Sequence, residues 1–182
     1  MICADVHNHT IASHGLATVS EMFAAAQARN LAWYGFSEHS PLPPGYACPL
    51  YTGDLTVTFP AYVDAVLALK ESAPSEGPRV LLGMELDWLP VNVPWMRKVL
   101  GHYPFDYVIG GLHYVQDVAV GSPRSWGEDL ALPQRFARYA AYYEEMARLA
   151  ASGLAEARAA IGQMRDAGVH DNGLGPELQA LL

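Results

Sequence analysis

A strand predicted at the start of the chain, Cys3 to Thr10, carries an aspartate and two histidines at alternate positions. Side chains along a strand point alternately to its two faces, so Asp5, His7 and His9 share one face. Two imidazoles and a carboxylate at this spacing could converge on a divalent metal ion, with Asp5 as a ligand or as the hydrogen-bond partner of one. The alternative is a polar strand edge on which both histidines are solvated.

Further histidines and carboxylates follow at the ends of three later apolar runs, residues 31–37, 79–87 and 107–112, which we predict to be strands. The side chains at these ends are Glu38, His39, Glu85, Asp87 and His113. The carboxyl ends of parallel strands meet at one rim, where α/β proteins build their sites. Strand ends are generally more polar than strand centres, but four successive ends with histidine or glutamate exceed that tendency and favour one shared site.

The segments between these strands have the periodicity and boundary residues of helices. Helices are predicted over residues 19–29, from Pro60, over 94–100, from Pro133 and over 154–167. The helix from Pro133 has an apolar stripe made of Phe136, Tyr139, Ala140, Tyr143, Met146 and Ala147. Thr18 and Glu21 fit a capping box at the start of the first helix. Strands that alternate with helices predict a parallel α/β sheet, with long loops over 41 to about 56 and over 117–129.

The composition fits a single α/β enzyme domain, because 51% of the 182 residues are apolar and only 16% are charged. The net charge of −8 argues against general affinity for nucleic acid. No apolar run is long enough to span a membrane, and the first strand begins too close to Met1 for a signal peptide. Cys3 and Cys48 form neither a disulfide framework nor a zinc motif. We therefore expect a cytoplasmic protein without nucleic-acid or membrane partners.

Four segments, in order and at suitable spacing, resemble the first four signatures of the PHP superfamily (polymerase and histidinol phosphatase). They are Asp5–Thr10, Gly35–Pro41, Gly83–Asp87 and Gly110–His113. The second and third segments are the most specific. The residues in the four segments are closer to those of the histidinol-phosphate phosphatase branch than to those of the other branches. Ser13-His14-Gly15 also fits the first loop of that branch. The resemblance covers residues 3 to about 153 and leaves 154–182 as a divergent helical tail.

The resemblance implies a partial or truncated form of a distorted (β/α)7 barrel, with up to three divalent metals at the rim. By position, the first metal would be held by His7, His9 and Glu85, the second by Glu85 and His113, and the third by His14 and His39. Such a mixture of imidazole and carboxylate ligands suits zinc, manganese or iron better than magnesium.

The implied activity is hydrolysis of L-histidinol phosphate to L-histidinol and phosphate, late in histidine biosynthesis, by a water that the metals activate. Glu85 and His113 would be the catalytic metal ligands. Asp5 and Asp87 would orient the imidazoles, unless they are solvated rim carboxylates. Ser37 and Tyr114 lie next to ligands in the sequence and could contact the substrate; for Tyr114 the alternative is packing inside the barrel.

The chain departs from the family after about residue 153. The His-Pro-Asp and Ser-Asp-x-His signatures, which complete the three metal sites in the family, do not occur in it. His170 and Asp171 form the last His/Asp pair, and either replace a missing ligand or lie in a solvated turn. An open half-barrel exposes sheet edges and apolar surface, so we expect a homodimer that covers the open side.

Two other functions remain open at this point. One is a catalytically impaired remnant that binds metal or a partner without turnover. The other is a phosphoesterase of the same superfamily that acts on a different small phosphate ester.

Overall fold

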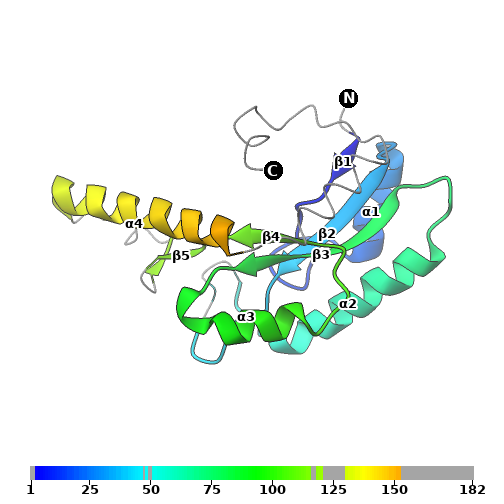
Figure 1. Cartoon of the computed structure of the whole chain (residues 1–182). Coiled ribbons are helices and arrows are strands. Elements are labelled where there is room, and N and C mark those ends of the chain that lie inside the picture. The colour runs from blue at the N-terminus through cyan, green and yellow to red at the C-terminus, as the bar shows by residue number, and fades with distance from the viewer. Residues whose placement is uncertain (1–2, 47, 49–50, 116–117, 121–129, 153–182) are drawn as a thin grey trace.

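The computed structural model describes residues 3–46, 48, 51–115, 118–120 and 130–152. Four parallel strands form one sheet in the order β1-β2-β3-β4 (Figure 1). The strands are β1 (Ala4–Asp5), β2 (Trp33–His39), β3 (Arg79–Asp87) and β4 (Tyr107–Gly111). The predicted α/β fold with about four parallel strands is thereby confirmed.

Helices connect the strands, as expected for parallel neighbours. They are α1 (Val19–Ala28), α2 (Leu55–Ser72), the short 3₁₀ helix η1 (Pro90–Asn92) and α3 (Val93–Leu100), followed later by α4 (Leu132–Ala151). In Figure 1, α1, α2 and α3 lie along one side of the sheet, whereas α4 extends away from it. None of the helices in the described ranges is long and apolar enough to cross a membrane.

The two faces of the sheet carry different side chains because positions alternate along each strand. Large apolar residues such as Phe36, Leu82 and Val108 pack against the helices and form the main core. The opposite face carries a smaller cluster of Trp33, Leu81 and Tyr107. On this second face, Trp33 is followed along β2 by Gly35, Ser37 and His39, and Leu81 is followed along β3 by Gly83, Glu85 and Asp87. The polar side chains of this face therefore lie at the carboxyl ends of the strands.

The ring of Tyr107 lies across this second face, in space that two glycines leave open. A methyl group at either Gly35 or Gly83 would overlap the Tyr107 ring. The Tyr107 hydroxyl donates a hydrogen bond of 2.7 Å to the carbonyl of Val6. Tyr107 therefore fixes the segment after β1, which carries His7 and His9.

The strand predicted over 31–37 is found two residues later, at β2 (Trp33–His39), and two other predicted boundaries differ more. The first strand contains only residues 4–5 and continues as irregular chain, because only Ala4 and Asp5 pair with β2. The second helix starts at Leu55, five residues before Pro60, because the Asp54 side chain accepts a hydrogen bond from the backbone of Thr56 and caps the helix there. Pro60 lies inside the helix.

At the start of the loop expected over 117–129, the structure describes a short strand that was not predicted, β6 (Val118–Ala119), which pairs antiparallel with β5 (Tyr114–Val115) just before the loop. The predicted helix over 154–167 lies outside the described residues. Helix α4 forms as predicted, but its apolar stripe does not pack against the sheet. Phe136 is 69% exposed and Tyr143 67%, while Leu149, on another side of the helix, is buried.

Candidate metal centre

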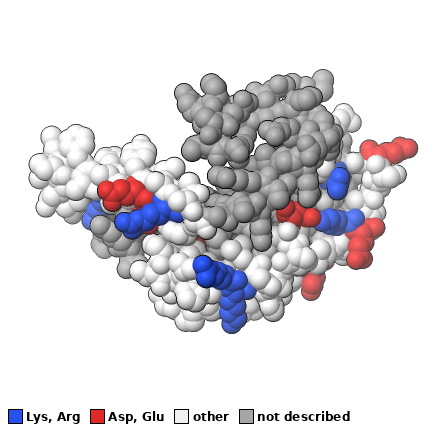
Figure 2. Space-filling view, viewed as in Figure 1, with Lys and Arg blue, Asp and Glu red and all other residues white. Residues whose placement is uncertain are grey.

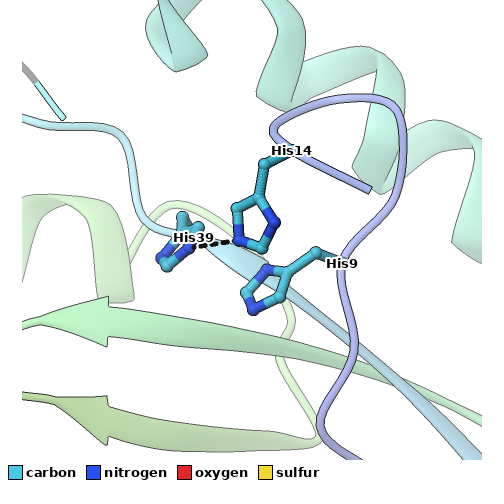
Figure 3. Close-up of side chains that lie close together, drawn as sticks. All are labelled: His9, His14 and His39. Carbon is cyan, nitrogen blue, oxygen red and sulfur yellow. Dashed lines mark hydrogen bonds between the residues drawn. The ribbon is translucent and has the colours of Figure 1, made fainter. Parts of the chain in front are cut away.

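The six predicted metal ligands come together at the carboxyl ends of the strands. His39 ends β2, Glu85 lies near the end of β3, and His113 follows β4. The irregular segment after β1 brings His7 and His9 to the same place. His14 follows from the next turn and reaches His39 (Figure 3).

Glu85 is the hub of this cluster. One carboxylate oxygen, Oε2, lies 3.3 Å from Nε2 of His7, 3.3 Å from Nε2 of His9 and 3.4 Å from Nδ1 of His39. The other oxygen, Oε1, lies 3.3 Å from Nε2 of His113. Gly111 makes this arrangement possible, because a methyl group there would collide with both Glu85 and His113. The two oxygens thus face different histidines, as a bridging carboxylate requires.

Three overlapping groups of side chains bring their donor atoms within 4.8 Å of one another. They are His9, His14 and His39; His7, His9 and Glu85; and His39, Asp87 and His113. Nδ1 of His39 is buried and has no hydrogen-bond partner among the described residues, although it faces Glu85 and Asp87. A nitrogen between two carboxylates is well placed to share a cation with them, and the donor set of imidazoles and carboxylates suits zinc or a similar metal. The described residues therefore fit divalent metals.

Glu38 orients His9 and is the functional residue that the sequence reading left without a role. Its side chain is fully buried and faces Nδ1 of His9 at 3.2 Å. It also accepts hydrogen bonds from both the backbone and the hydroxyl of Thr10, and from the hydroxyl of Ser13. Burial opposes ionisation of Glu38, but these bonds outweigh it and lower its pKa to about 2. The carboxylate fixes the ring of His9 so that Nε2 faces Glu85. A glutamate next to a predicted ligand at a strand end was the available signal.

We expect Glu38→Gln to weaken zinc binding about 10- to 100-fold, because a neutral amide is a poorer acceptor for His9 and places an NH₂ group among the donors of Thr10 and Ser13. Isothermal titration of zinc into the metal-free chain measures this change. Glu71→Gln, at an exposed position on α2, is the matched control. Equal zinc affinities in the two variants would contradict the role assigned to Glu38.

Asp87 contacts His113 in the way predicted for an orienting carboxylate. Its Oδ1 lies 2.7 Å from Nδ1 of His113, and its Oδ2 accepts a hydrogen bond from the hydroxyl of Ser40. Asp5 differs: its carboxylate is bonded to the backbone N–H of His7 at 3.4 Å and belongs to none of the three groups.

The charges of the metal-free centre depend on its buried carboxylates, Glu38, Glu85 and Asp87. Burial opposes ionisation of Glu85, but its bonds to His113 and His9 hold its pKa far below the usual range. Its partners gain protons: bonding to Asp87 and Glu85 raises the pKa of His113 to about 10. For His9, burial acts downward, but Glu38 and Glu85 outweigh it and raise the pKa to about 9. Burial lowers the pKa of His39 to about 4.

A metal must therefore displace protons from His9 and His113. We expect zinc binding at pH 7.5 to release about two protons per chain, and the apparent affinity to rise with pH until pH passes the raised pKa values of these two histidines. Titration calorimetry in buffers of different ionisation enthalpy counts the protons. Asp87→Asn, which removes the charge that raises the pKa of His113, should release about one proton fewer. Zinc binding without proton release would contradict the assignment.

The two residues predicted to contact substrate are both buried. The hydroxyl of Ser37 accepts a hydrogen bond from the backbone N–H of Asn8 and donates one to its carbonyl, at 3.0 and 3.1 Å. Ser37 is fully buried, so in this structure it positions the segment that carries His7 and His9 rather than facing a substrate. Tyr114 is 7% exposed and belongs to the main core. His170 and Asp171 lie outside the described residues.

Comparison with known proteins supports the relationship that these motifs suggest. Residues 5–178 match the family model of the PHP domain. A probable histidinol-phosphatase of Deinococcus radiodurans is 32% identical over 112 residues, which are 61% of this chain and 42% of that protein. A crystal structure of histidinol phosphate phosphatase from Lactococcus lactis, complexed with zinc, L-histidinol and phosphate, superposes with a TM-score of 0.60 at 18% identity. That superposition covers 75% of this chain and 49% of the other.

The chain therefore spans about half the length of the relatives it matches. The structural likeness identifies the four parallel strands and their helices as a curled half of a (β/α) barrel. The family match covers nearly all of the sequence, and the clustered histidines and carboxylates lie in the segments that carry the family motifs. The chain belongs to the PHP domain family.

Proposed function

We propose that the chain is a metal-dependent phosphomonoesterase that hydrolyses L-histidinol phosphate to L-histidinol and phosphate. The observation that carries the proposal is the position of Glu85, whose two oxygens face four histidines from three separate parts of the chain. The names of the Deinococcus and Lactococcus relatives support this substrate.

We assign the residues of the metal centre the following roles. His7, His9 and Glu85 hold a first metal, and Glu85 with His113 holds a second. Zinc, manganese or iron at these positions would neutralise phosphate oxygens and lower the pKa of a bound water enough to make it a nucleophile at neutral pH. Glu38 keeps the ring of His9 in place.

Asp87 holds His113 from the other side of its ring, so that Nε2 is turned toward Glu85. Tyr114 directly follows His113, but it is buried in the main core, so we propose for it the packing role that the sequence left open.

The phosphatase activity is tested with the metal-free chain reloaded with zinc, manganese or iron. We expect phosphate release from L-histidinol phosphate to exceed release from other small phosphate esters, and elemental analysis to show retained metal. If another ester released phosphate faster, the proposed substrate would be wrong, but the proposed reaction, hydrolysis of a phosphate monoester, would stand.

Retained metal without release from any ester would favour the alternative of a catalytically impaired metal-binding relative.

We also propose that two copies associate, with the apolar stripe of α4 in the contact. Leu132, Phe136, Tyr139, Tyr143 and Met146 are all exposed, and the visible outer end of α4 carries few charged side chains (Figure 2). Exposed apolar surface of this kind commonly marks an interface. Sedimentation velocity should show a dimer that Phe136→Glu dissociates, whereas Ala137→Glu, which adds the same charge beside the stripe, should not. A monomeric wild-type chain would contradict this proposal.

A further inference from the structure

An open groove lies between the start of α1 and the outer side of α2, away from the metal centre. It has a volume of about 590 Å³, and none of the residues that line it is charged. Residues 10–12 and 18–20 form one wall. The other wall is one side of α2, with the exposed residues Thr58, Ala61, Ala65, Ala68 and Ser72. Because these five side chains are small, the groove stays open along the helix.

Hydrogen bonds fix the shape of this groove. Tyr62, which also lines it, is 3% exposed. The Tyr62 hydroxyl donates a hydrogen bond of 2.9 Å to the carbonyl of Gly83 and accepts one of 3.3 Å from the backbone N–H of Glu38. The Thr58 hydroxyl donates to the carbonyl of Ala12 at 3.4 Å and joins the two walls. The groove is therefore preformed, so that filling it requires little ordering of the protein.

Helix α4 carries an apolar stripe with the spacing of the groove. Leu132, Phe136, Tyr139, Tyr143 and Met146 follow one another at intervals of four and three residues. The five exposed residues of α2 in the groove do so at intervals of three and four. Both sets span the same length of helix, from 132 to 146 and from 58 to 72, which is about 21 Å. Large side chains on one helix can thus fit between small ones on the other.

The stripe of one chain does not reach its own groove. In Figure 1, α4 extends away from the sheet at one end of the molecule, whereas α1 and most of α2 lie toward the other end. The last turns of α4 are attached to the body of the protein, because Trp88 donates a hydrogen bond of 2.9 Å to Glu145 and Leu149 is buried. A second copy of the chain therefore presents the matching surface, and the projection of α4 leaves the stripe accessible to it.

The area of such a contact is sufficient for a stable dimer. Phe136, Tyr139 and Tyr143 are 45–69% exposed, and a fully covered aromatic side chain buries about 150–250 Å². With Leu132 and Met146, the stripe offers roughly 400–500 Å², and the groove contributes a similar area. Two copies that exchange α4 make this contact twice, which buries roughly 1,600–2,000 Å² in total, the size of a standard stable interface.

We propose that two copies of the chain associate by exchanging α4, so that the apolar stripe of each copy lies in the groove between α1 and α2 of the other. This closed two-fold arrangement uses both surfaces of both copies and leaves neither surface free for a third chain. The proposal rests on the homodimer part of the proposed function, for which it names the surface that receives α4. It is independent of the phosphatase activity.

Sedimentation velocity of the full chain tests the role of the groove. The wild-type chain should be a dimer. Ala65→Glu places a carboxylate in the middle of the groove and should weaken dimerisation at least about 100-fold, because the dimer would bury two unpaired charges. Ala24→Glu adds the same charge at an exposed position of α1 outside the groove and is the matched control, which should dimerise as the wild type does.

A mixture of two variants distinguishes exchange of α4 from a contact between two α4 stripes. Phe136→Glu damages the stripe and leaves the groove intact, whereas Ala65→Glu does the reverse. Each variant alone should be monomeric at a concentration at which the wild type is dimeric. Mixed in equal amounts, with a fluorescent label on one of them, they should form a heterodimer that has one intact contact. An unfolded chain could not restore this contact, so the heterodimer also shows that both variants fold.

A monomeric wild-type chain would overturn the proposal in favour of another occupant of the groove. So would an Ala65→Glu chain that dimerises as strongly as Ala24→Glu. Two variants that do not associate when mixed, although each keeps the circular dichroism of the wild type, would also overturn it. The expected dimer and heterodimer without phosphate release from any ester would uphold the exchange of α4 and reject the proposed phosphatase activity.

Discussion

Replacing Glu85 by glutamine should reduce the hydrolysis of L-histidinol phosphate by about 10³-fold or more, since several kcal/mol of charge stabilisation depend on the metals it holds. One carboxylate oxygen of Glu85 faces His7, His9 and His39, and the other faces His113. A neutral amide has a single acceptor oxygen, so it cannot serve both sides of the centre. Initial rates of phosphate release and the zinc content of the same preparation measure the two losses together.

The Glu85→Gln chain should remain folded, because glutamine keeps the shape of the side chain and His9 and His113 retain their partners Glu38 and Asp87. Circular dichroism checks this. Glu71→Gln is the matched control and should behave as wild type. Wild-type turnover in Glu85→Gln, with unchanged zinc content, would mean that Glu85 does not bridge metals and that the centre is organised differently.

The parts of the fold that the sequence predicts well are those that its own apolar runs determine. Strand β3 is found at the predicted residues 79–87, because a run of apolar residues buried on both faces has few alternatives. The end of strand β1 is predicted poorly. The residues that follow Asp5 are held by side chains far along the chain, Ser37 and Tyr107, and no local sequence pattern indicates such contacts.

The candidate site follows the same division. Parallel strands place His39, Glu85 and His113 at one rim, which alternation and strand direction are sufficient to predict. The role of Glu38 required knowledge of how the segment after β1 turns back, since its partners Thr10 and His9 lie 28 and 29 residues away. Helix periodicity identified α4, but it could not tell which side of that helix faces the sheet.

Gly83→Ala is expected to lower the free energy of unfolding by about 3 kcal/mol, the upper end of the usual cost of overpacking. The added methyl group would overlap the ring of Tyr107. That ring cannot simply turn away, because its hydroxyl is bonded to the carbonyl of Val6 at 2.7 Å and the ring is 6% exposed. Urea denaturation monitored by circular dichroism measures the loss. Gly53→Ala is the control, since a methyl group there meets no atom within 4 Å.

If the ring of Tyr107 is the cause, then Tyr107→Leu in the same chain should relieve part of the cost, and the two substitutions should be less destabilising together than the sum of their separate effects. Gly83→Ala should also weaken zinc binding, because Val6 precedes His7 and the segment that carries the first metal ligands would lose its support. A Gly83→Ala chain as stable as Gly53→Ala, with unchanged zinc affinity, would show that Tyr107 does not connect the packing of the sheet to the metal centre.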